Sequence, residues 1–314
     1  MVRPGGGGEF PPPTPALRYF VNVIPGGGPR LLRMPDRRRY YTGDRVNPLV
    51  LLRYRNGGWP PHGKVTVTVS RPDAGAGNLL SGAKLSPPAD VDGDTLPARQ
   101  ATLAALEERA GRPVIGYTEE ELELFDDPDN TEGRFEPGGI FGRPLRDFLR
   151  MEGSYTFHFR ARYGHGCTAT RELIWSLHVD VGIDPGRTDV TTTLGPARPD
   201  GRRGVTLVLV PRDRYGNQLG PGRPDAVSVT GAPGTTVSPG VVDNGDGSYT
   251  VTGSWDPASG NEPGVVLQQP GRPCVALQAP RPAPQAVDDG GRWKPLIWLL
   301  LLVILVLLLL LLLT

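Results

Sequence analysis

The sequence predicts an all-β fold: two β-sandwich domains in tandem, the first with a helical insertion, followed by one C-terminal transmembrane helix. Three observations lead to this prediction. Short segments rich in β-branched and aromatic residues alternate between apolar and polar positions, as half-buried strands do. The 43 glycines and 35 prolines of the 314 residues lie largely between these segments, where they favour turns. The chain ends in an uninterrupted apolar run, Leu296 to Leu313.

The first domain is expected at residues 17–185, after a Gly/Pro-rich segment, 1–16, whose composition is typical of disorder. Tyr155, Phe157 and Phe159 occupy alternate positions, so we expect them to face the core, because successive side chains of a strand point to opposite faces. The strands of this domain are expected at 17–24, 46–54, 64–70, 154–163 and 171–183.

One helix is expected inside this domain, near 97–110. Leu103, Leu106 and Ala110 recur at intervals of three and four residues, which is the spacing of one helix face. A proline is tolerated at the first helical position, and the glycine at 111 suits the end. We expect this helix to lie in an insertion between strands and to cover one side of the sandwich.

The second domain is expected at 204–280, after residues 186–203, which form a linker or a short edge strand. Its strands are expected at 204–211, 226–230, 247–253, 264–268 and 274–277. Short strands about ten residues apart, separated by turn residues, are typical of a β-sandwich. A further linker, 281–294, leads to the apolar run.

Two stretches of the second domain carry a family resemblance. Residues 210–217 (VPRDRYGN) and 243–251 (DNGDGSYTV) resemble the Asp-x-x-Gly-Asn turn and the Asp-Gly-(Ser/Thr)-Tyr-x-Val strand of filamin-type immunoglobulin-like repeats. The resemblance covers about 205–280 and implies an immunoglobulin-like sandwich. Asn-Gly and Asp-Gly pairs favour a tight hairpin, and we expect Tyr249 and Val251 to face the core.

A second resemblance lies in the first domain. Residues 124–142 (LFDDPDNTEGRFEPGGIFG), followed by 152–157 (EGSYTF), are similar to a β-sandwich module found beside von Willebrand factor A domains in surface proteins, including calcium-activated chloride channel regulators. Pro128 and Gly138 replace a glycine and an aspartate of that pattern. The sequence contains no Asp-x-Ser-x-Ser motif of an A domain. Both domains are therefore expected to be immunoglobulin-like sandwiches.

Acidic and amide residues crowd the same stretch and form a candidate calcium site. Hard oxygen ligands at this density suit Ca²⁺, which takes six to eight of them. The spacing does not complete an EF-hand loop, and an acidic, solvated turn is the alternative reading. The candidate ligands are Asp126, Asp127, Asp129, Asn130, Glu132 and Glu136.

Motifs for catalysis or nucleic-acid binding are not found in the sequence, so we expect neither activity. It contains no Gly-x-Ser-x-Gly, His-Glu-x-x-His or phosphate-binding loop. Ser81 and Lys84 match Ser-x-x-Lys, but the accompanying Ser-Asp-Asn and Lys-Thr-Gly motifs are missing. The formal net charge is +1, and the arginines are scattered among acidic residues.

The remaining histidines and cysteines are isolated in sequence. His158 and His178 lie on strands whose other face is apolar, so both are expected to face solvent. Cys167 and Cys274 are 107 residues apart, and no Cys-x-x-Cys pair occurs. We expect two separate buried thiols, although an oxidising compartment would permit a disulfide.

The apolar tail, 295–314, is expected to form a transmembrane helix in contact with membrane lipid. Eighteen helical residues span about 27 Å, close to the roughly 30 Å hydrocarbon core of a bilayer. Trp293 and Trp298 lie at one end, where aromatic rings favour the headgroup region. Arg292 and Lys294 would keep the preceding chain cytosolic. Export of that chain, or a cleavable sorting tail, are the alternatives.

These observations lead to a non-catalytic, membrane-anchored surface protein that displays immunoglobulin-like domains for adhesion, for binding or as a stalk. The bias toward arginine, glycine, proline and alanine suggests a GC-rich, bacterial genome, and we expect the domains on the extracytoplasmic face. One alternative is the C-terminal accessory region of a larger von Willebrand factor A-type surface protein. Another is a cytosol-facing, tail-anchored scaffold.

Calorimetric titration distinguishes the two readings of the acidic stretch. A calcium site releases or absorbs heat on addition of millimolar Ca²⁺ and raises the melting temperature, because an ion that binds only the folded state stabilises it. A solvated acidic turn gives neither effect, and that result would remove the calcium reading.

Overall fold

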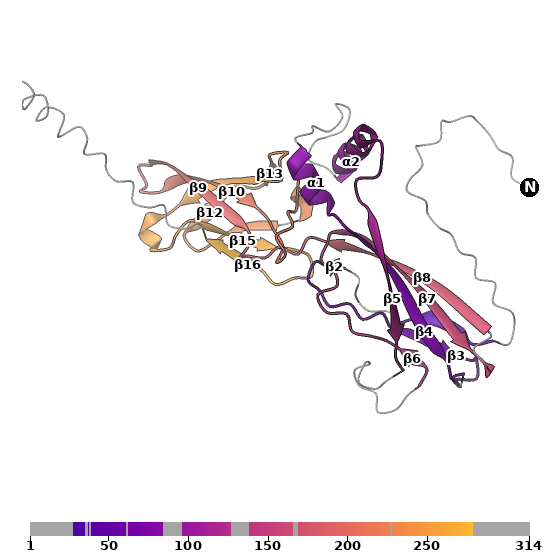
Figure 1. Cartoon of the computed structure of the whole chain (residues 1–314). Coiled ribbons are helices and arrows are strands. Elements are labelled where there is room, and N and C mark those ends of the chain that lie inside the picture. Colours follow the sequence, from indigo (N-terminus) through magenta and orange to yellow (C-terminus); the bar gives the residue numbers. More distant parts are fainter. Residues whose placement is uncertain are drawn as a thin grey trace, which may run out of the picture. The chain divides into compact units, whose positions relative to one another are not determined.

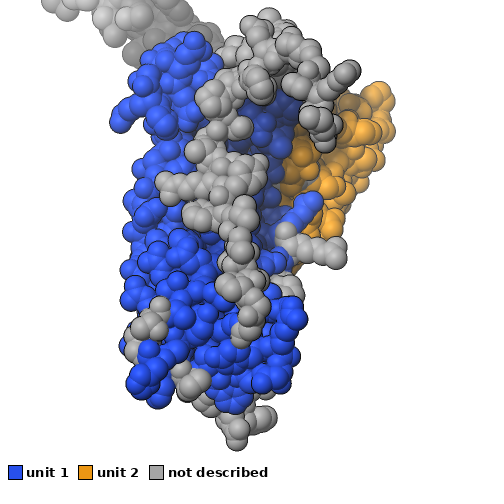
Figure 2. Space-filling model, turned by 90° about the vertical axis from the view of Figure 1, so that its right-hand side faces the viewer, with its two compact units in different colours: residues 1–187, 211–223, 245–247 blue, residues 188–210, 224–244, 248–314 orange. Residues whose placement is uncertain are grey.

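The structure, a computed structural model, describes residues 28–34, 37, 39–60, 62–83, 96–126, 138–165, 169–226 and 228–278. These residues are predominantly β, and their strands form four sheets (Figure 1). The chain divides into two compact units, drawn in different colours in Figure 2. Unit 1 consists of Met1–Arg187, Pro211–Arg223 and Gly245–Gly247, and unit 2 of Thr188–Val210, Pro224–Asn244 and Ser248–Thr314. Unit 1 thus includes two segments that lie beyond the expected first domain.

Unit 1 contains a larger sheet with the strand order β2-β8-β7-β4-β5 and a smaller one with the order β1-β3-β6. Neighbouring strands are antiparallel, except that β2 runs parallel to β8. In chain order the strands are β1 (Arg30–Arg33), β2 (Tyr40–Tyr41), β3 (Val50–Arg53), β4 (Lys64–Pro72), β5 (Tyr117–Leu124), β6 (Ile140–Phe141), β7 (Gly153–Tyr163) and β8 (Ala169–Asp180).

Both sheets of unit 1 contribute to one hydrophobic core. Every second residue of β4 from Val65 to Val69 is a fully buried valine, and the expected inward positions of Tyr155, Phe157 and Phe159 are confirmed. Trp175 of β8 stacks on Phe157 with ring centroids 4.7 Å apart. The smaller sheet adds Leu31, Val50, Leu52 and Phe141 to this core. Two sheets that share one core form a sandwich, as the alternation predicts.

Two helices, α1 (Ala76–Ala83) and α2 (Leu96–Ala110), lie between β4 and β5 in the chain. The expected helical insertion is therefore confirmed, and α2 has the expected bounds to within one residue. Both helices lie at the end of the larger sheet where β4 ends and β5 begins (Figure 1), so the expectation that the helix covers a side of the sandwich is wrong. α1 was not expected from the sequence.

The buried face of α2 differs from the expected one. Ala98, Arg99 and Thr102 are the buried residues of this helix, whereas Leu103 and Leu106 are only partly buried. The apolar spacing was misleading because the helix is held in place by a charged side chain. A helix can bury a long basic residue when its charge and its donors are all matched.

Arg99 lies in an ion cluster, which we define as Arg99, Glu152, Asp180 and Arg223. Arg99 Nη2 donates to Glu152 Oε1 at 2.5 Å, and the two side chains are only 4% and 5% exposed. Arg223 contacts Glu152 at 3.8 Å and donates to Asp180 Oδ1 at 3.1 Å from both terminal nitrogens. Two positive and two negative charges therefore balance within unit 1.

Backbone groups complete the environment of this cluster. Arg99 Nη1 donates to the carbonyl oxygens of Leu219 and Pro221, each at 2.8 Å. The second oxygen of Glu152 accepts from the backbone N–H of Gly77 at 3.0 Å. Buried charges are tolerated when the surrounding groups satisfy their hydrogen bonds, and these bonds do so for both oxygens of Glu152 and for both terminal nitrogens of Arg99.

The segment Pro211–Arg223 belongs to unit 1 and is ordered by its own Asp-x-x-Gly-Asn turn. Asp213 is fully buried, and its Oδ1 accepts from the backbone N–H of Tyr215 and of Asn217. Asn217 Nδ2 donates to the other carboxylate oxygen of Asp213 and to the Arg150 carbonyl. Gly216 has φ +89°, which a residue without Cβ adopts readily.

Asn78 of α1 joins this turn to the helical insertion. Its side-chain nitrogen donates to Asn217 Oδ1 at 3.0 Å, and its side-chain oxygen accepts from the backbone N–H of Gln218 at 2.8 Å. Gly77 must lack a side chain, because a Cβ there would collide with the carbonyl oxygens of Gln218 and Leu219. Residues more than 130 positions apart thus share one packed region of unit 1.

Unit 2 has a larger sheet with the order β12-β14-β10-β9, in which β13 also pairs with β14, and a smaller sheet with the order β11-β15-β16. Its elements are β9 (Asp189–Ala197), β10 (Arg203–Val210), η3 (Pro224–Ala226), β11 (Ser228–Gly231), β12 (Thr235–Val237), β13 (Val242–Asp243), β14 (Tyr249–Trp255), η4 (Pro257–Ser259), β15 (Gly264–Gln268) and β16 (Val275–Gln278). Of the two readings of 186–203, the edge strand is the one found, as β9.

The core of unit 2 follows the expected alternation. Tyr249 and Val251 are 0% and 1% exposed, so their inward orientation is confirmed. Across β10 and β14 they lie opposite Leu209 and Leu207, which are equally buried. The smaller sheet contributes Val265, Leu267 and Leu277. Cys274, expected to be buried, is exposed beside β16, and this expectation is wrong.

Some expectations fall outside the described residues: the disordered segment 1–16, the strand at 17–24, Cys167, the linker 281–294 and the helix at 295–314. In the part of the chain that the structure describes, no helix has the length and the apolar character needed to cross a membrane. The transmembrane helix therefore stays a prediction from the sequence.

Substitution of Arg99 tests the role of the ion cluster. Arg99→Ala leaves Glu152 buried with its closest partner removed, and we expect the free energy of unfolding to fall by about 3–5 kcal/mol. Arg160→Ala is the matched control, because Arg160 Nε contacts Glu172 at 3.0 Å on an exposed surface, where an ion pair contributes about 0–1 kcal/mol. Urea denaturation followed by tryptophan fluorescence measures the free energy of unfolding of both variants. Equal losses of stability in Arg99→Ala and Arg160→Ala would contradict a structural role for the cluster.

Candidate ligand-binding pocket

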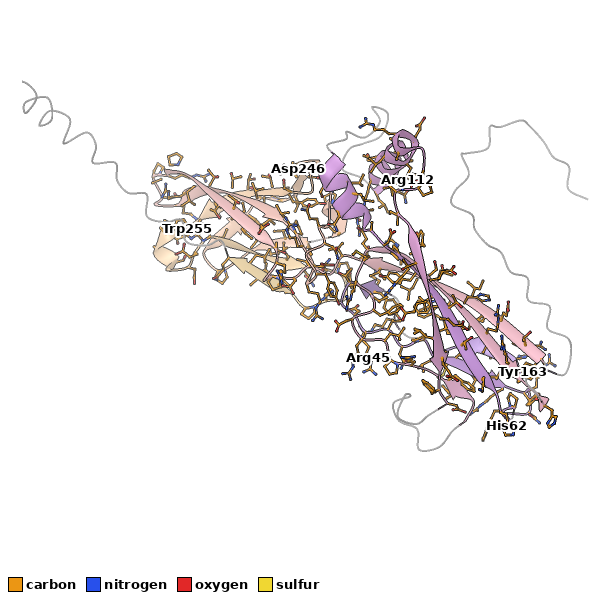
Figure 3. The ribbon with its side chains drawn as sticks, viewed as in Figure 1. Arg45, His62, Arg112, Tyr163, Asp246 and Trp255 are labelled. Atoms are coloured by element: carbon orange, nitrogen blue, oxygen red, sulfur yellow. The ribbon has the colours of Figure 1, made fainter. Side chains whose placement is uncertain are left out.

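A pocket of about 250 Å³ lies in unit 1, at the end of the larger sheet where β4 begins and β5 ends. Three separate stretches of the chain meet there: the residues before β4, the end of β5, and β6. His62, labelled in Figure 3, marks this end of the sheet. The lining residues are Trp59, Pro60, His62, Gly63, Lys64, Glu123, Leu124, Phe125, Asp126 and Phe141.

Trp59 is positioned by the turn that follows β3. The backbone N–H of Tyr54 donates to the Gly58 carbonyl at 2.8 Å, and Gly57 has φ +87°. The Trp59 side chain then lies against the backbone of Gly139, where a Cβ would be 2.8 Å from the Cβ of Trp59. Gly139 also has φ +74°, so a glycine is needed there for both reasons.

Phe125 and Phe141 supply the other aromatic surfaces. Phe125 exchanges two backbone hydrogen bonds with Gly142, at 3.0 and 3.1 Å, which joins the end of β5 to the residue after β6. Phe141 is 7% exposed and forms part of the core, whereas Phe125 is 43% exposed and Trp59 is 49% exposed. The pocket therefore has a buried aromatic base and two aromatic side chains open to solvent.

Charged groups lie beside these rings. Lys64 and Glu123 are exposed, one at the start of β4 and the other near the end of β5. Asp126 adds a second carboxylate. Donors and acceptors of hydrogen bonds thus surround an aromatic surface, which is the usual composition of a site that orients a small polar molecule.

Asp126 is also a structural residue. Its Oδ1 accepts from the backbone N–H of Gly138 at 3.1 Å and its Oδ2 from that of Gly139 at 2.7 Å. Arg53 Nε donates to the Gly138 carbonyl at 2.9 Å and holds the same backbone from β3. An ionised carboxylate offers about four acceptor positions, so these two bonds neither require a metal nor prevent one.

The other candidate calcium ligands, Asp127, Asp129, Asn130, Glu132 and Glu136, lie outside the described residues. Among the residues that are described, no group of three or more His, Cys, Asp or Glu side chains is arranged to hold a metal ion. The calcium site remains a prediction. Ser81, the first residue of the Ser-x-x-Lys match, donates its hydroxyl to the Gly77 carbonyl at 2.7 Å within α1, which is a common local bond in helices.

The histidines on the larger sheet lie on its outer face, as expected: the side chains of His158 and His178 are 27% and 57% exposed. His158 Nε2 lies 3.2 Å from Glu172, which also accepts from Arg160 at 3.0 Å. Burial raises the pKa of the Glu172 carboxyl, but the hydrogen bonds from Arg160 and His158 and their charges outweigh burial and lower that pKa. This group is an exposed ion-pair network.

The pocket was not predicted from the sequence, in which neither Trp59 nor Phe125 was given a role. One signal was available: Trp59 follows the turn residues Asn56-Gly57-Gly58, and connecting segments lie at the surface, where binding residues are often found. The convergence of Trp59, Phe125 and Phe141 depends on strand pairing between distant segments, which no local pattern specifies.

No protein-family model matches the sequence, and no curated protein matches it. A solved structure of Escherichia coli alpha-2-macroglobulin activated by porcine elastase is similar to this chain at 12% sequence identity and a TM-score of 0.28. The match covers 83% of this chain and 23% of the other chain, so this chain spans about a quarter of the length of that protein. A likeness of this size supports neither a shared family nor a shared activity.

Replacement of Asp126 tests how the pocket is supported. Asp126→Ala leaves the buried backbone N–H groups of Gly138 and Gly139 without their acceptor, so we expect the free energy of unfolding to fall by about 1–3 kcal/mol. Asp126→Asn keeps one acceptor oxygen, so its free energy of unfolding should lie between that of Asp126→Ala and that of the wild type. Asp200→Ala, which removes a single bond to Arg202 N in an exposed turn, should change the free energy by no more than about 0.5 kcal/mol. Equal stability of Asp126→Ala and the wild type would contradict the supporting role.

Proposed function

We propose that this chain is a non-catalytic, membrane-anchored surface protein whose immunoglobulin-like domains bind a ligand outside the cytoplasm. The observation that carries the proposal is the pocket of unit 1, in which Trp59 and Phe125 are 49% and 43% exposed beside charged side chains. Large aromatic side chains are costly to leave in water, and where they gather at a pocket they mark a binding surface.

Support for an immunoglobulin-like fold comes from both units. Each combines a larger and a smaller sheet, and neighbouring strands are antiparallel apart from β2 with β8. In residues 205–280 the two filamin-type sequence patterns coincide with a buried Asp213 turn and with β14, whose Tyr249 is fully buried. Domains of this kind present loops and sheet ends to partners, and the pocket lies at such an end.

Support for membrane attachment comes from the sequence of the tail. Leu296 to Leu313 contains no charged residue, and its length matches the hydrocarbon core of a bilayer. With this tail as the anchor, units 1 and 2 would be displayed at the membrane surface. The basic residues Arg292 and Lys294 favour the opposite orientation, a scaffold facing the cytosol, and the experiment must separate these two cases.

Protease treatment of intact cells distinguishes surface display from a scaffold that faces the cytosol. With an epitope placed in the exposed turn at Gly245, we expect loss of the epitope signal from intact cells, while a cytosolic marker protein remains whole. A second strain that lacks residues 296–313 should release the protein from the membrane fraction. Full protection of the epitope in intact cells, with digestion after lysis, would overturn surface display and support the cytosol-facing scaffold.

A further inference from the structure

We infer that the pocket of unit 1 binds a neutral carbohydrate, with a pyranose ring seated against Trp59 and Phe125. The inference rests on the proposed function, since it names the class of ligand for the same site. It is carried by three properties of the pocket: the exposed aromatic surfaces, the mixture of charges around them, and the available volume.

The aromatic surfaces fit one face of a sugar ring. A pyranose presents several C–H groups on a face and its hydroxyl groups around the rim. The face of an aromatic ring is electron-rich, so it attracts C–H groups that carry a partial positive charge. Trp59 and Phe125 are both about half exposed, although Phe141 next to them is buried. Both exposed rings line the same pocket, so a ring-shaped ligand there can pack against an aromatic face without any rearrangement of the core.

The charges favour a ligand that both donates and accepts hydrogen bonds. The Lys64 ammonium can only donate, whereas the carboxylates of Glu123 and Asp126 can only accept. A hydroxyl group does both, so the rim of a sugar can satisfy either kind of partner. The two carboxylates disfavour an anionic ligand such as a phosphate, and Lys64 offsets one of their charges. A neutral polyhydroxylated molecule can bond to all three groups and brings no charge of its own.

The volume limits how much of the ligand can be enclosed. At about 250 Å³, the pocket is somewhat smaller than the roughly 300–1,000 Å³ of sites that enclose a drug-sized molecule. One sugar ring can occupy it, and the neighbouring units of a longer chain would extend over the surface. Only a short part of a carbohydrate chain can therefore be enclosed by the pocket. Because the neighbouring sugar units add contacts on the surface, the affinity for a hexasaccharide should exceed the affinity for its monosaccharide.

The walls of the pocket are held in place before a ligand arrives. Asp126 accepts from two backbone N–H groups, and Gly139 accommodates the Trp59 side chain. Gly63 lies next to Phe141, where an added Cβ would be 3.6 Å from the ring and 3.2 Å from Leu52. A pre-formed site loses little conformational entropy on binding, which a small contact surface requires.

Isothermal titration with purified full-length protein tests the inference. The protein is kept in a polyoxyethylene detergent, because a maltoside headgroup is itself a sugar and would compete. The probes are neutral hexasaccharides of glucose, xylose, mannose and N-acetylglucosamine, with an oligogalacturonate of equal length as the charged probe. We expect saturable binding of at least one neutral probe and weaker binding of the oligogalacturonate.

Variants connect the binding to the pocket. Trp59→Ala and Phe125→Ala should each weaken the affinity about tenfold or more, while Trp59→Tyr keeps an aromatic face and should retain most of it. Tyr117→Ala is the matched control, because Tyr117 is 54% exposed at the opposite end of β5 and should leave the affinity unchanged. Circular dichroism confirms that each variant is folded.

Three results would overturn the inference: no binding of any neutral probe, binding that survives Trp59→Ala, or tighter binding of the oligogalacturonate than of every neutral probe. The titration uses purified protein, so its outcome does not depend on which side of a membrane the chain faces. If the titration detects no carbohydrate binding but protease digests the epitope on intact cells, the carbohydrate ligand is rejected and surface display is retained. If the titration detects binding but the epitope is protected on intact cells, surface display alone is rejected.

Discussion

The packing of unit 1 depends on the buried ion pair of Arg99 and Glu152. Two charges withdrawn from water are stable only when every donor and acceptor around them is satisfied, and here the partners come from distant parts of the chain. Gly77 supplies an N–H from α1, and Leu219 and Pro221 supply carbonyl oxygens from the segment Pro211–Arg223. The pair therefore selects one arrangement of the helices and of that segment, because any other leaves a buried charge unmatched.

This requirement explains why unit 1 is not continuous in sequence. The strands before residue 187 form the sandwich core, but they do not provide all of the groups that the ion cluster and Asn78 need. Pro211–Arg223 provides them, and the turn of Asp213 and Asn217 gives this segment a defined shape of its own. The Asp-x-x-Gly-Asn pattern is thus a structural motif here, and its polar residues are occupied by hydrogen bonds within unit 1.

The pocket lies at the other end of the same sheet. β4 runs from Lys64, which lines the pocket, to Pro72, shortly before α1 and the region of the ion cluster. The groups at the two ends differ: Arg99 and Glu152 are buried and paired at one end, and Trp59 and Phe125 are exposed at the other. Exposed aromatic side chains add little to folding stability, and the proposed ligand would give Trp59 and Phe125 a role at the pocket. A rigid sheet between the two ends supports a site with fixed geometry.

The sequence by itself determined the β character of the chain, the alternation that buries Tyr155 to Phe159 and Tyr249 to Val251, and the bounds of α2, because these depend on the spacing of neighbouring residues. Only the tertiary structure decided that α2 buries Arg99, that Pro211–Arg223 belongs to unit 1, and that Trp59 and Phe125 line one pocket. The structure also shows β5, an edge strand that was not predicted because a run of glutamates interrupts the alternation of apolar residues. Leu122 and Leu124 are its buried residues. The physical reason is the same in each case. The partners of a buried charge, of an edge strand and of a pocket residue lie far away in the chain, and the local spacing of residues does not specify them.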